Sequence, residues 1–447
     1  MPHTALHDRI WTTLWLDTHE HLLEESTRLA GPYDDSLRRF PCDDWAFLLR
    51  NYGIDDLVSA GLPMASYRQV LGRELSPHAK WSLVAPYWQR VQNTGYLRAL
   101  RASTEALFGL RLAAETVDEI TRRMHQAAQP GFYRRILRHV AGVRACQVNS
   151  VEATFCPSEQ PDLLRQDLAV HGFSLVDRAR FEEWQQVTGI AVDGLASLLR
   201  IVDWYFDHYG HRAVAVKSAW AYARRLAVAP PSRAEAQRLM DAYLRGADDN
   251  ITPLQDYVFT YCVERAAAAH LPIKLHTGYF AGNNDMPLAR VQANLADLCP
   301  VLSRHRGATF VLMHIAYPYQ NELLALCKHW SNVVVDLCWA WSIDPISTTD
   351  FVRRFLVTAP VSKLLCFGGD VTAVENVPGH AELARRGLFR ALSSLVDDGF
   401  FGEHEALMLV DPLMHGNARA IFPLEGQDGP DDFRWSAQPQ HPSRGEE

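Results

Sequence analysis

Six residues whose side chains can bind metal ions stand at or near the ends of short apolar runs. They are His19, His21, Lys217, His276, His314 and Asp370. The pair His19 and His21 alone means little, because a chain with 19 histidines in 447 residues contains roughly 0.8 H-x-H pairs by chance. Imidazole and carboxylate donors suit Zn, Fe, Mn or Ni, and a site poor in thiolates disfavours iron–sulfur clusters and Cu(I). The set therefore predicts a metal centre if the fold brings its members together.

Lys217 is the unusual member of the set. An ammonium group would repel a metal ion, so Lys217 fits only if its charge is removed. Carbamylation by CO2 would convert the amine into a carboxylate that is able to bridge two metal ions.

Eight short apolar runs supply the elements that would position these residues. They span 12–19, 143–150, 166–175, 211–218, 271–278, 308–316, 332–340 and 362–370. Helical patterns between the later runs imply parallel strands joined by crossover helices, and the apolar character of the runs implies that both strand faces are buried. In a barrel of this kind, active residues gather at the carboxyl ends of the strands. The sequence predicts an α/β fold, a (β/α)8 TIM barrel, with an open doubly wound sheet as the alternative.

The long interval between the first two runs sets the domain organisation. Residues 27–140 carry helical patterns, for example over 35–53 and 103–128, and predict a helical insertion or cap after strand 1. The chain as a whole, 1–447, is expected to form one barrel around that insertion. Its polar, Pro- and Gly-rich end, 424–447, predicts a mobile tail.

Alternation along the first strand predicts which side chains face the barrel interior. Residues two apart share a face, so Asp17, His19 and His21 are expected to point inward together. Glu20, between the two histidines, is expected to point away from the metals.

The composition and the net charge indicate which classes of partner and which compartment to expect. A net charge of −8 without a basic run gives no footprint for nucleic acid or an anionic membrane surface, which favours a small-molecule substrate. No stretch approaches the roughly 18 consecutive apolar residues of a membrane span, and the start of the chain lacks a signal-peptide pattern. Eight cysteines without a C-x-x-C pair are typical of reduced core thiols. We therefore expect a soluble cytoplasmic protein and leave a homo-oligomer open.

Five ordered motifs carry a family resemblance. The stretches "DTHEH", "AVKSAWAYARRL", "IKLHTGY", "VLMHIAYPY" and "CFGGD" together resemble the amidohydrolase superfamily, a group of metal-dependent TIM barrels. The similarity covers about 12–21 and 211–400 and leaves the insertion outside it.

The resemblance implies two divalent metal ions and a role for each donor. His19, His21 and Asp370 would hold one ion, and His276 and His314 would hold the second. A carbamylated Lys217 would bridge the two ions, and Asp370 and Lys217 would be the catalytic residues.

The loops that follow the donor strands are rich in aromatic residues. As substrate-binding residues we predict Trp220, Tyr222, Tyr279, Tyr317, Trp339 and Trp341, with Phe280 and Tyr319 beside them. Pockets for apolar ligands are lined by such side chains with few polar anchors, so the rim suggests a large apolar substrate. The competing explanation is that these rings pack cap helices onto the barrel.

Four polar residues are further candidates. Asn283, Glu375 and Asn376 lie on strand-end loops from which they could reach the metals or the substrate. Lys274 is expected to neutralise a buried aspartate such as Asp17 or Asp336.

The chain is also similar to a small dioxygen-activating diiron branch of this superfamily, represented by the monooxygenase of platensimycin and platencin biosynthesis. That similarity implies a nonheme diiron monooxygenase with two Fe ions, O2, an electron donor and a bulky, terpenoid-like acid carried as a coenzyme A thioester. The alternative is a metal-dependent hydrolase, with Zn or Mn and a metal-bridging water that attacks an amide or ester. Decarboxylation, isomerisation and metal-stabilised binding without catalysis remain minor alternatives.

Overall fold

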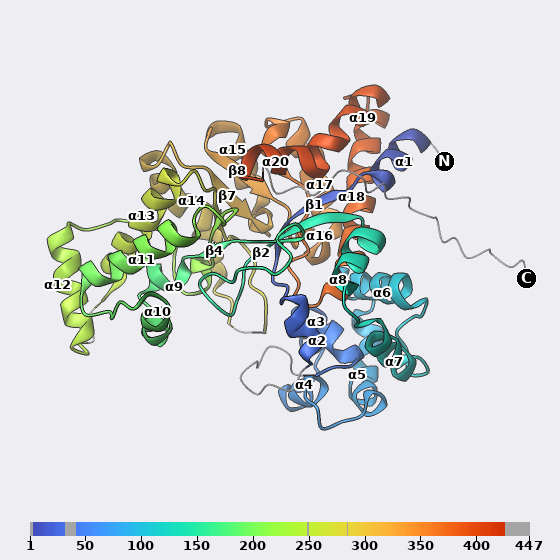
Figure 1. Ribbon diagram of the computed structural model, residues 1–447. Coiled ribbons are helices and arrows are strands. Elements are labelled where there is room, and N and C mark those ends of the chain that lie inside the picture. Colours follow the sequence, from blue (N-terminus) through green and yellow to red (C-terminus); the bar gives the residue numbers. More distant parts are fainter. Residues whose placement is uncertain (1–2, 32–41, 248–249, 284, 425–447) are drawn as a thin grey trace, which may run out of the picture.

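A ring of parallel strands forms the centre of the molecule (Figure 1). The computed structural model describes residues 3–31, 42–247, 250–283 and 285–424. The strands are β1 (Trp15–Glu20), β2 (Val143–Val148), β3 (Leu164–Gln166), β4 (Leu168–Ala169), β5 (Val216–Ser218), β6 (Ile273–Leu275), β7 (Phe310–Met313), β8 (Val333–Asp336) and β9 (Leu364–Leu365). Neighbours pair in the orders β1-β2-β3 and β4-β5-β6-β7-β8-β9, and every pair is parallel.

Hydrogen bonds join these two sheets into a closed barrel. Between β3 and β4, Asp167 N donates to Val148 O on one side (2.8 Å), and Leu168 N donates to Ala215 O on the other (2.9 Å). After β9, Phe367 O accepts from Thr18 N of β1 at 2.9 Å. The segments β3 and β4 are thus one strand position interrupted at Asp167, and the predicted eight-stranded α/β barrel is confirmed over the open sheet.

The third strand position ends earlier than the sequence pattern predicts. The apolar run 166–175 was expected to be extended throughout, but α9 (His171–Leu175) already begins two residues after β4. The apolar run continues into that helix, because a short apolar segment is compatible with either a strand or a buried helix.

Aliphatic side chains fill the barrel at the end opposite the predicted donors. Leu16, Ala145, Val214, Ala215, Val311, Val334 and Leu365 form this cluster with Ala418, Phe422 and Leu424 from the end of the described chain. Helix α20 (Asn417–Ile421) carries part of this plug. That end is closed by packing, and the predicted donors lie at the other end, where the strands finish.

Helices surround the ring and occupy the connections between strands (Figure 1). These are α1 (Thr4–Thr12), α9, α10 (Phe181–Thr188), α11 (Leu195–Tyr209), α12 (Arg233–Leu244), α13 (Thr252–Ala268), α14 (Leu288–Arg304), α15 (Gln320–His329), α16 (Ala340–Ile343), α17 (Pro345–Leu356), α18 (Val377–Asp397) and α19 (Glu403–Asp411). Local signals set their starts: Asp344 caps α17 by accepting from Ser347 N at 2.9 Å, with Pro345 at the first helical position.

The chain between β1 and β2 is helical. Its helices are α2 (Glu25–Ala30), α3 (Gly53–Ser59), α4 (Met64–Leu71), α5 (Pro77–Val91), α6 (Gly95–Phe108), α7 (Val117–Ala127) and α8 (Phe132–Arg134). Trp45, Phe47, Trp81 and Trp88 belong to a hydrophobic cluster of their own. The pattern over 103–128 holds parts of two helices rather than one, because α6 ends at Phe108, directly before Gly109, whose φ of 63° is left-handed. The predicted tail lies outside the described residues except for Leu424.

Helices α6 and α18 approach so closely that only glycine fits between them. A Cβ on Gly379 would lie 1.7 Å from Ala99 O. We therefore predict that Gly379→Ala lowers the free energy of unfolding by about 1–3 kcal/mol, because an extra methyl group must push the helices apart. Urea denaturation measures the change. Gly307→Ala, with nothing within 4 Å of its Cβ, should stay within about 0.5 kcal/mol of wild type, and equal losses in both variants would contradict the prediction.

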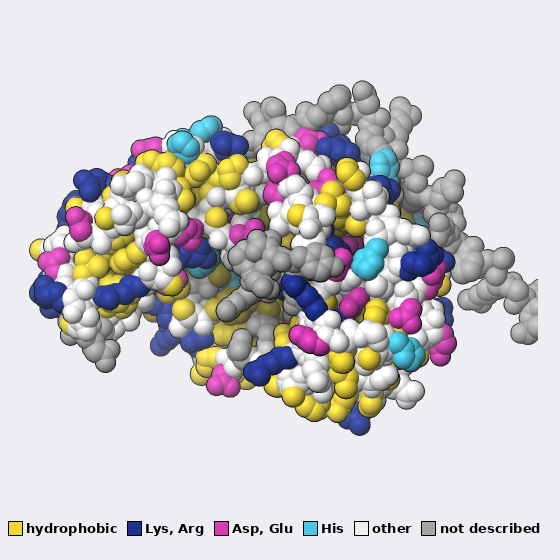
Figure 2. Space-filling view, turned by 60° about the horizontal axis from the view of Figure 1, so that its bottom comes forward, with side chains coloured by type: hydrophobic (Ala, Val, Ile, Leu, Met, Phe, Trp, Pro, Cys, Tyr) yellow, Lys and Arg dark blue, Asp and Glu magenta, His cyan; other side chains and the backbone are white. Residues whose placement is uncertain are grey.

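Surface features are unremarkable in the described ranges. No helix there combines the length and apolar character that crossing a membrane requires. Figure 2 shows basic and acidic side chains interspersed over the face that it displays.

Candidate metal centre

Three donors meet where β1 lies beside the loop that follows β9. His19 Nε2 and His21 Nε2 each lie 3.2 Å from Asp370 Oδ1. One donor atom from each residue fits within a span of 4.8 Å, the spacing expected of ligands to one ion. His21 Nδ1 lies 2.8 Å from Asn149 O, which leaves Nε2 to face the carboxylate. Two imidazoles and a carboxylate fit a divalent ion such as Fe, Zn or Mn.

Three further donors extend this cluster across the barrel. Lys217, at β5, places Nζ 3.3 Å from His19 Nε2. His276 and His314 directly follow β6 and β7, and His314 Nε2 lies 2.9 Å from His276 Nδ1. Five strand positions thus bring all six predicted ligands to one end of the barrel.

Backbone strain accompanies two of the donors. His314 has a φ of 60° and Asp370 a φ of 58°, and Ile315 and Ala316 share the left-handed region. Such conformations cost free energy in residues with a Cβ and persist where surrounding structure enforces them, often at functional sites.

A register shift in β1 turns two consecutive side chains inward. Pairing with β2 is irregular between Asp17 and Glu20. Thr18 Oγ1 donates to Asp336 Oδ1 inside the barrel (2.9 Å), and His19 faces the donors. Asp17 instead pairs with Cys146, whose thiol belongs to the outer core. The predicted inward position of Asp17 is therefore wrong, because alternation fails across the irregularity.

Glu20 is held against the loop after β9. Its Oε2 accepts a hydrogen bond from Val371 N at 2.7 Å, and a Cβ on Gly369 would clash with this carboxylate. Burial raises the pKa of Glu20 well above its usual value and that of Asp17 to about 7.

Burial sets the protonation states of the donors. It lowers the pKa values of His19 and His276 and brings that of His314 to about 4. Burial raises the pKa of Asp370, but His19 and His21 outweigh it and hold that pKa well below its usual value. Metal ions bind neutral imidazoles and ionised carboxylates, so these are the states a metal site requires.

Burial also lowers the pKa of Lys217. The effect favours the uncharged amine, which is the form able to react with CO2.

Aromatic rings wall the side of the site formed by His276 and His314. The Tyr222 ring lies 4.3 Å from the His276 ring. Trp339 meets His314 edge-on at 5.2 Å. Tyr279 lies 5.8 Å from Trp339, and its carbonyl is 2.9 Å from His276 Nε2. These three of the predicted rim residues lie next to the donors.

The remaining predicted rim residues lie farther out. Tyr317 lies 6.0 Å from Tyr279. Trp220 is buried and stacks on Phe259 at 4.5 Å. Trp341 is buried, donates from Nε1 to Cys366 O at 2.7 Å, and packs on α18. Trp220 and Trp341 thus pack helices onto the barrel.

Two tyrosines from the insertion complete the wall, and sequence reasoning missed both. Tyr52 stacks on Trp339 at 4.8 Å and on Tyr96 at 5.0 Å. Its hydroxyl also donates a hydrogen bond to the backbone carbonyl of Asp370. Nothing in the local sequence of the insertion indicates that these residues reach the donors.

Three of the polar candidates form contacts with the insertion instead of with the donors. Asn283 Nδ2 donates to Asp55 O (3.1 Å), Asn376 Nδ2 donates to Leu48 O (3.0 Å), and Glu375 pairs with Arg28 (3.1 Å). These contacts join the barrel loops to the insertion.

Lys274 has a different partner from the one predicted. It pairs with Asp167, at 2.8 Å and 3.0 Å from the two carboxylate oxygens, rather than with Asp17 or Asp336. A carboxylate at an inward position near the end of the third strand was the signal that sequence reasoning overlooked.

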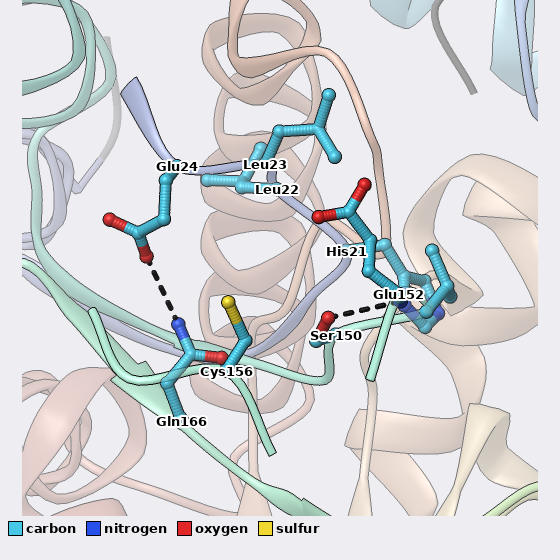
Figure 3. A pocket seen from close by; sticks show the side chains of 9 residues that line it. His21, Leu22, Leu23, Glu24, Ser150, Glu152, Cys156 and Gln166 are labelled. Atoms are coloured by element: carbon cyan, nitrogen blue, oxygen red, sulfur yellow. Dashed lines mark hydrogen bonds between the residues drawn. The ribbon is translucent and has the colours of Figure 1, made fainter. Parts of the chain in front are cut away.

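A small cavity lies beside His21 (Figure 3). It is lined by His21, Leu22, Leu23, Glu24, Ser150, Val151, Glu152, Cys156 and Gln166. Gln166 Nε2 donates to Glu24 Oε1 across it at 3.4 Å. His21 is also the most exposed donor of its group, with 19% of its side chain accessible. The cavity thus reaches the donor cluster at His21.

His380 is a buried histidine close to the site, and its titration should make the stability of the protein depend on pH. It is buried on α18, 6.2 Å from the Tyr52 ring, and burial lowers its pKa from 6.5 to about 4. Between these values the unfolded chain binds a proton that the folded chain does not. The metal-free protein should therefore lose stability as the pH falls from about 6.5 to 4, by on the order of 3 kcal/mol from this group.

Urea unfolding of metal-free protein across that pH range measures the effect. His380→Gln should flatten the dependence without abolishing it, because His314 titrates in the same window. Identical slopes for wild type and variant would contradict the assignment.

Comparison with known proteins supplies the family. A family profile described as amidohydrolase matches residues 176–424. Protein fluG of Emericella nidulans is 26% identical over 235 residues, which are 48% of this chain and 26% of that protein. The uronate isomerase of Xanthomonas axonopodis pv. citri is 29% identical over 222 residues, 44% of this chain and 46% of the isomerase. The chain thus matches less than half of the length of either relative.

The fold is also found in a solved structure. The glucuronate isomerase from Caulobacter crescentus superposes with a TM-score of 0.74 at 17% identity, over 96% of this chain and 95% of that one. The family profile spans more than half of this sequence and includes Lys217, His276, His314 and Asp370. The chain belongs to the amidohydrolase family.

Proposed function

We propose that this protein is a nonheme diiron monooxygenase that uses O2 to hydroxylate a bulky apolar acid. The observation that carries the proposal is an aromatic wall, formed by rings from the barrel and the insertion, beside a cluster of six nitrogen and oxygen donors of which five are buried. The sequence resemblance to a dioxygen-activating branch of the family supports it.

The donor set can be divided between two ions. His19, His21 and Asp370 would hold one ion, and His276 and His314 the other. Two bound iron ions would supply the redox and Lewis-acid chemistry that O2 activation needs.

Lys217 would join the two halves of the site. Its uncharged amine can attack CO2, and the resulting carbamate forms with the loss of one proton. The product is a carboxylate-like group on Nζ, which lies 3.3 Å from His19 Nε2. Asp370, ionised and 3.2 Å from both His19 Nε2 and His21 Nε2, is placed to accept a proton from a bound group.

The aromatic wall beside the donors suggests the class of substrate. Tyr222, Trp339 and Tyr52 offer ring faces and edges to whatever lies next to the donors. Apolar carbon skeletons gain most from such contacts, whereas polyhydroxylated molecules must bury hydroxyl groups that need hydrogen-bond partners. A coenzyme A thioester as carrier and a separate electron donor complete the proposal.

A metal-dependent isomerase of a sugar acid is the second candidate. It is favoured by the likeness to uronate isomerases in sequence and in fold. A hydrolase of an amide or ester fits the family but has no further observation in its favour.

One set of assays separates these candidates. Protein purified without oxygen is analysed for Fe and Zn per chain, then mixed with O2, a reductant and a polycyclic acyl-coenzyme A. Two Fe per chain, substrate-dependent O2 uptake and a product heavier by one oxygen atom would support the monooxygenase. Conversion of D-glucuronate without O2 uptake would establish the isomerase, and two Zn with ester or amide cleavage would establish the hydrolase; either result overturns the proposal.

A further inference from the structure

Asp167 lies inside the barrel where the third strand position is interrupted. Its side chain is fully buried, and both of its carboxylate oxygens contact Lys274 Nζ. Lys274 Nζ also donates to Thr18 O at 2.7 Å, the carbonyl directly before His19. The pair therefore supports the backbone of β1 at the point where the donors begin.

His19 presents its two ring nitrogens to different groups. Nε2 faces the donor cluster, 3.2 Å from Asp370 Oδ1 and 3.3 Å from Lys217 Nζ. Nδ1 has no hydrogen-bond partner among the described residues, and Asp167 Oδ2 lies 3.9 Å from it. Nε2 is thus the ligating nitrogen, and Nδ1 is the one that carries the proton.

A metal-binding histidine normally donates the hydrogen of its other nitrogen to a carboxylate or carbonyl, which fixes both ring orientation and tautomer. From this geometry we infer that Asp167, held by Lys274, is a positioning residue that orients His19 for metal binding. The inference rests on the proposed metal site. It assigns to the buried Asp167–Lys274 pair a task beyond packing, since such pairs contribute little net stability by themselves.

The test is the affinity of the protein for Zn2+, measured by competition with a chromophoric chelator. Asp167→Asn keeps the shape of the side chain and removes its charge. We expect Zn2+ to bind about 10–100-fold more weakly, as for the loss of other carboxylates that orient metal ligands. The visible spectrum of the Co2+-loaded variant should also change, because it reports ligand geometry.

A second buried pair provides the matched control. Lys80 in α5 pairs with Asp44 within the insertion, with the lysine fully buried. Asp44→Asn should lower thermal stability and leave Zn2+ affinity and the Co2+ spectrum unchanged. If Asp167→Asn alone does not fold, the double variant Asp167→Asn with Lys274→Gln replaces the ion pair by two neutral amides and carries the same expectation.

The outcomes separate the two levels of the argument. Weaker Zn2+ binding in the Asp167 variants alone supports the inference. Wild-type affinity and spectrum in those variants overturn it and leave the metal site standing. Wild-type protein that binds neither Zn2+ nor Co2+ overturns the metal site and the proposed function as well.

Discussion

An Asp370→Asn variant is expected to lose about 10²–10⁴-fold in turnover while keeping its fold. The carboxylate lies 3.2 Å from the Nε2 atoms of both His19 and His21, and these neighbours hold its pKa well below the usual value. The amide keeps the shape but has neither the negative charge that attracts a cation nor the capacity to take up a proton. The ion at His19 and His21 should therefore also bind more weakly. Turnover with the acyl-coenzyme A substrate and metal content per chain are the two measurements.

The control for this variant is a buried, paired carboxylate outside the barrel. Asp256 on α13 accepts from Arg224 at 2.7 Å and from Ala229 N at 2.8 Å. Asp256→Asn should cost stability without changing metal content. Undiminished turnover and full metal content in Asp370→Asn would show that Asp370 belongs to the core and not to the reaction.

Removal of the His276 imidazole should halve the metal content. His314 Nε2 lies 2.9 Å from His276 Nδ1. Together these two histidines would supply the nitrogen ligands of the second ion. With His276→Ala only His314 remains on that side, whereas His19, His21 and Asp370 keep the first site. We expect one ion per chain instead of two and the loss of any reaction that requires both. Elemental analysis after dialysis against metal-free buffer measures the ratio.

His305→Ala serves as the comparison for that experiment. His305 is the half-buried residue after α14, on the outside of the barrel, and its replacement should leave two ions bound. If His276→Ala also retains two ions, His276 is not a ligand and the division of the donors is incorrect.

The barrel and its donors could be predicted because their signals are local. Each strand position is marked by an apolar run in the sequence. Each candidate donor could be identified because it stands at the end of such a run or just after it. The strand order confirms the predicted barrel, and the assignment of the six residues as metal ligands stays a prediction. The inward face of β1 could not be predicted, because two register shifts, between Trp15 and Leu16 and between Asp17 and Glu20, change which side chains point into the barrel.

Other parts of the site depend on contacts between distant segments. The partner of Lys274 could have been any carboxylate on a neighbouring strand, and only the closed ring shows that it is Asp167. Tyr52 and Tyr96 lie more than 200 residues from Trp339 in the chain, and no periodicity within the insertion indicates that their rings would stack beside it.

The hydrogen bond from Tyr52 to the carbonyl of Asp370 joins the insertion to the main chain of a donor residue. The same tyrosine ring covers Trp339 in the aromatic wall. One side chain of the insertion, Tyr52, therefore couples the packing of the aromatic wall to the main chain that positions the Asp370 carboxylate.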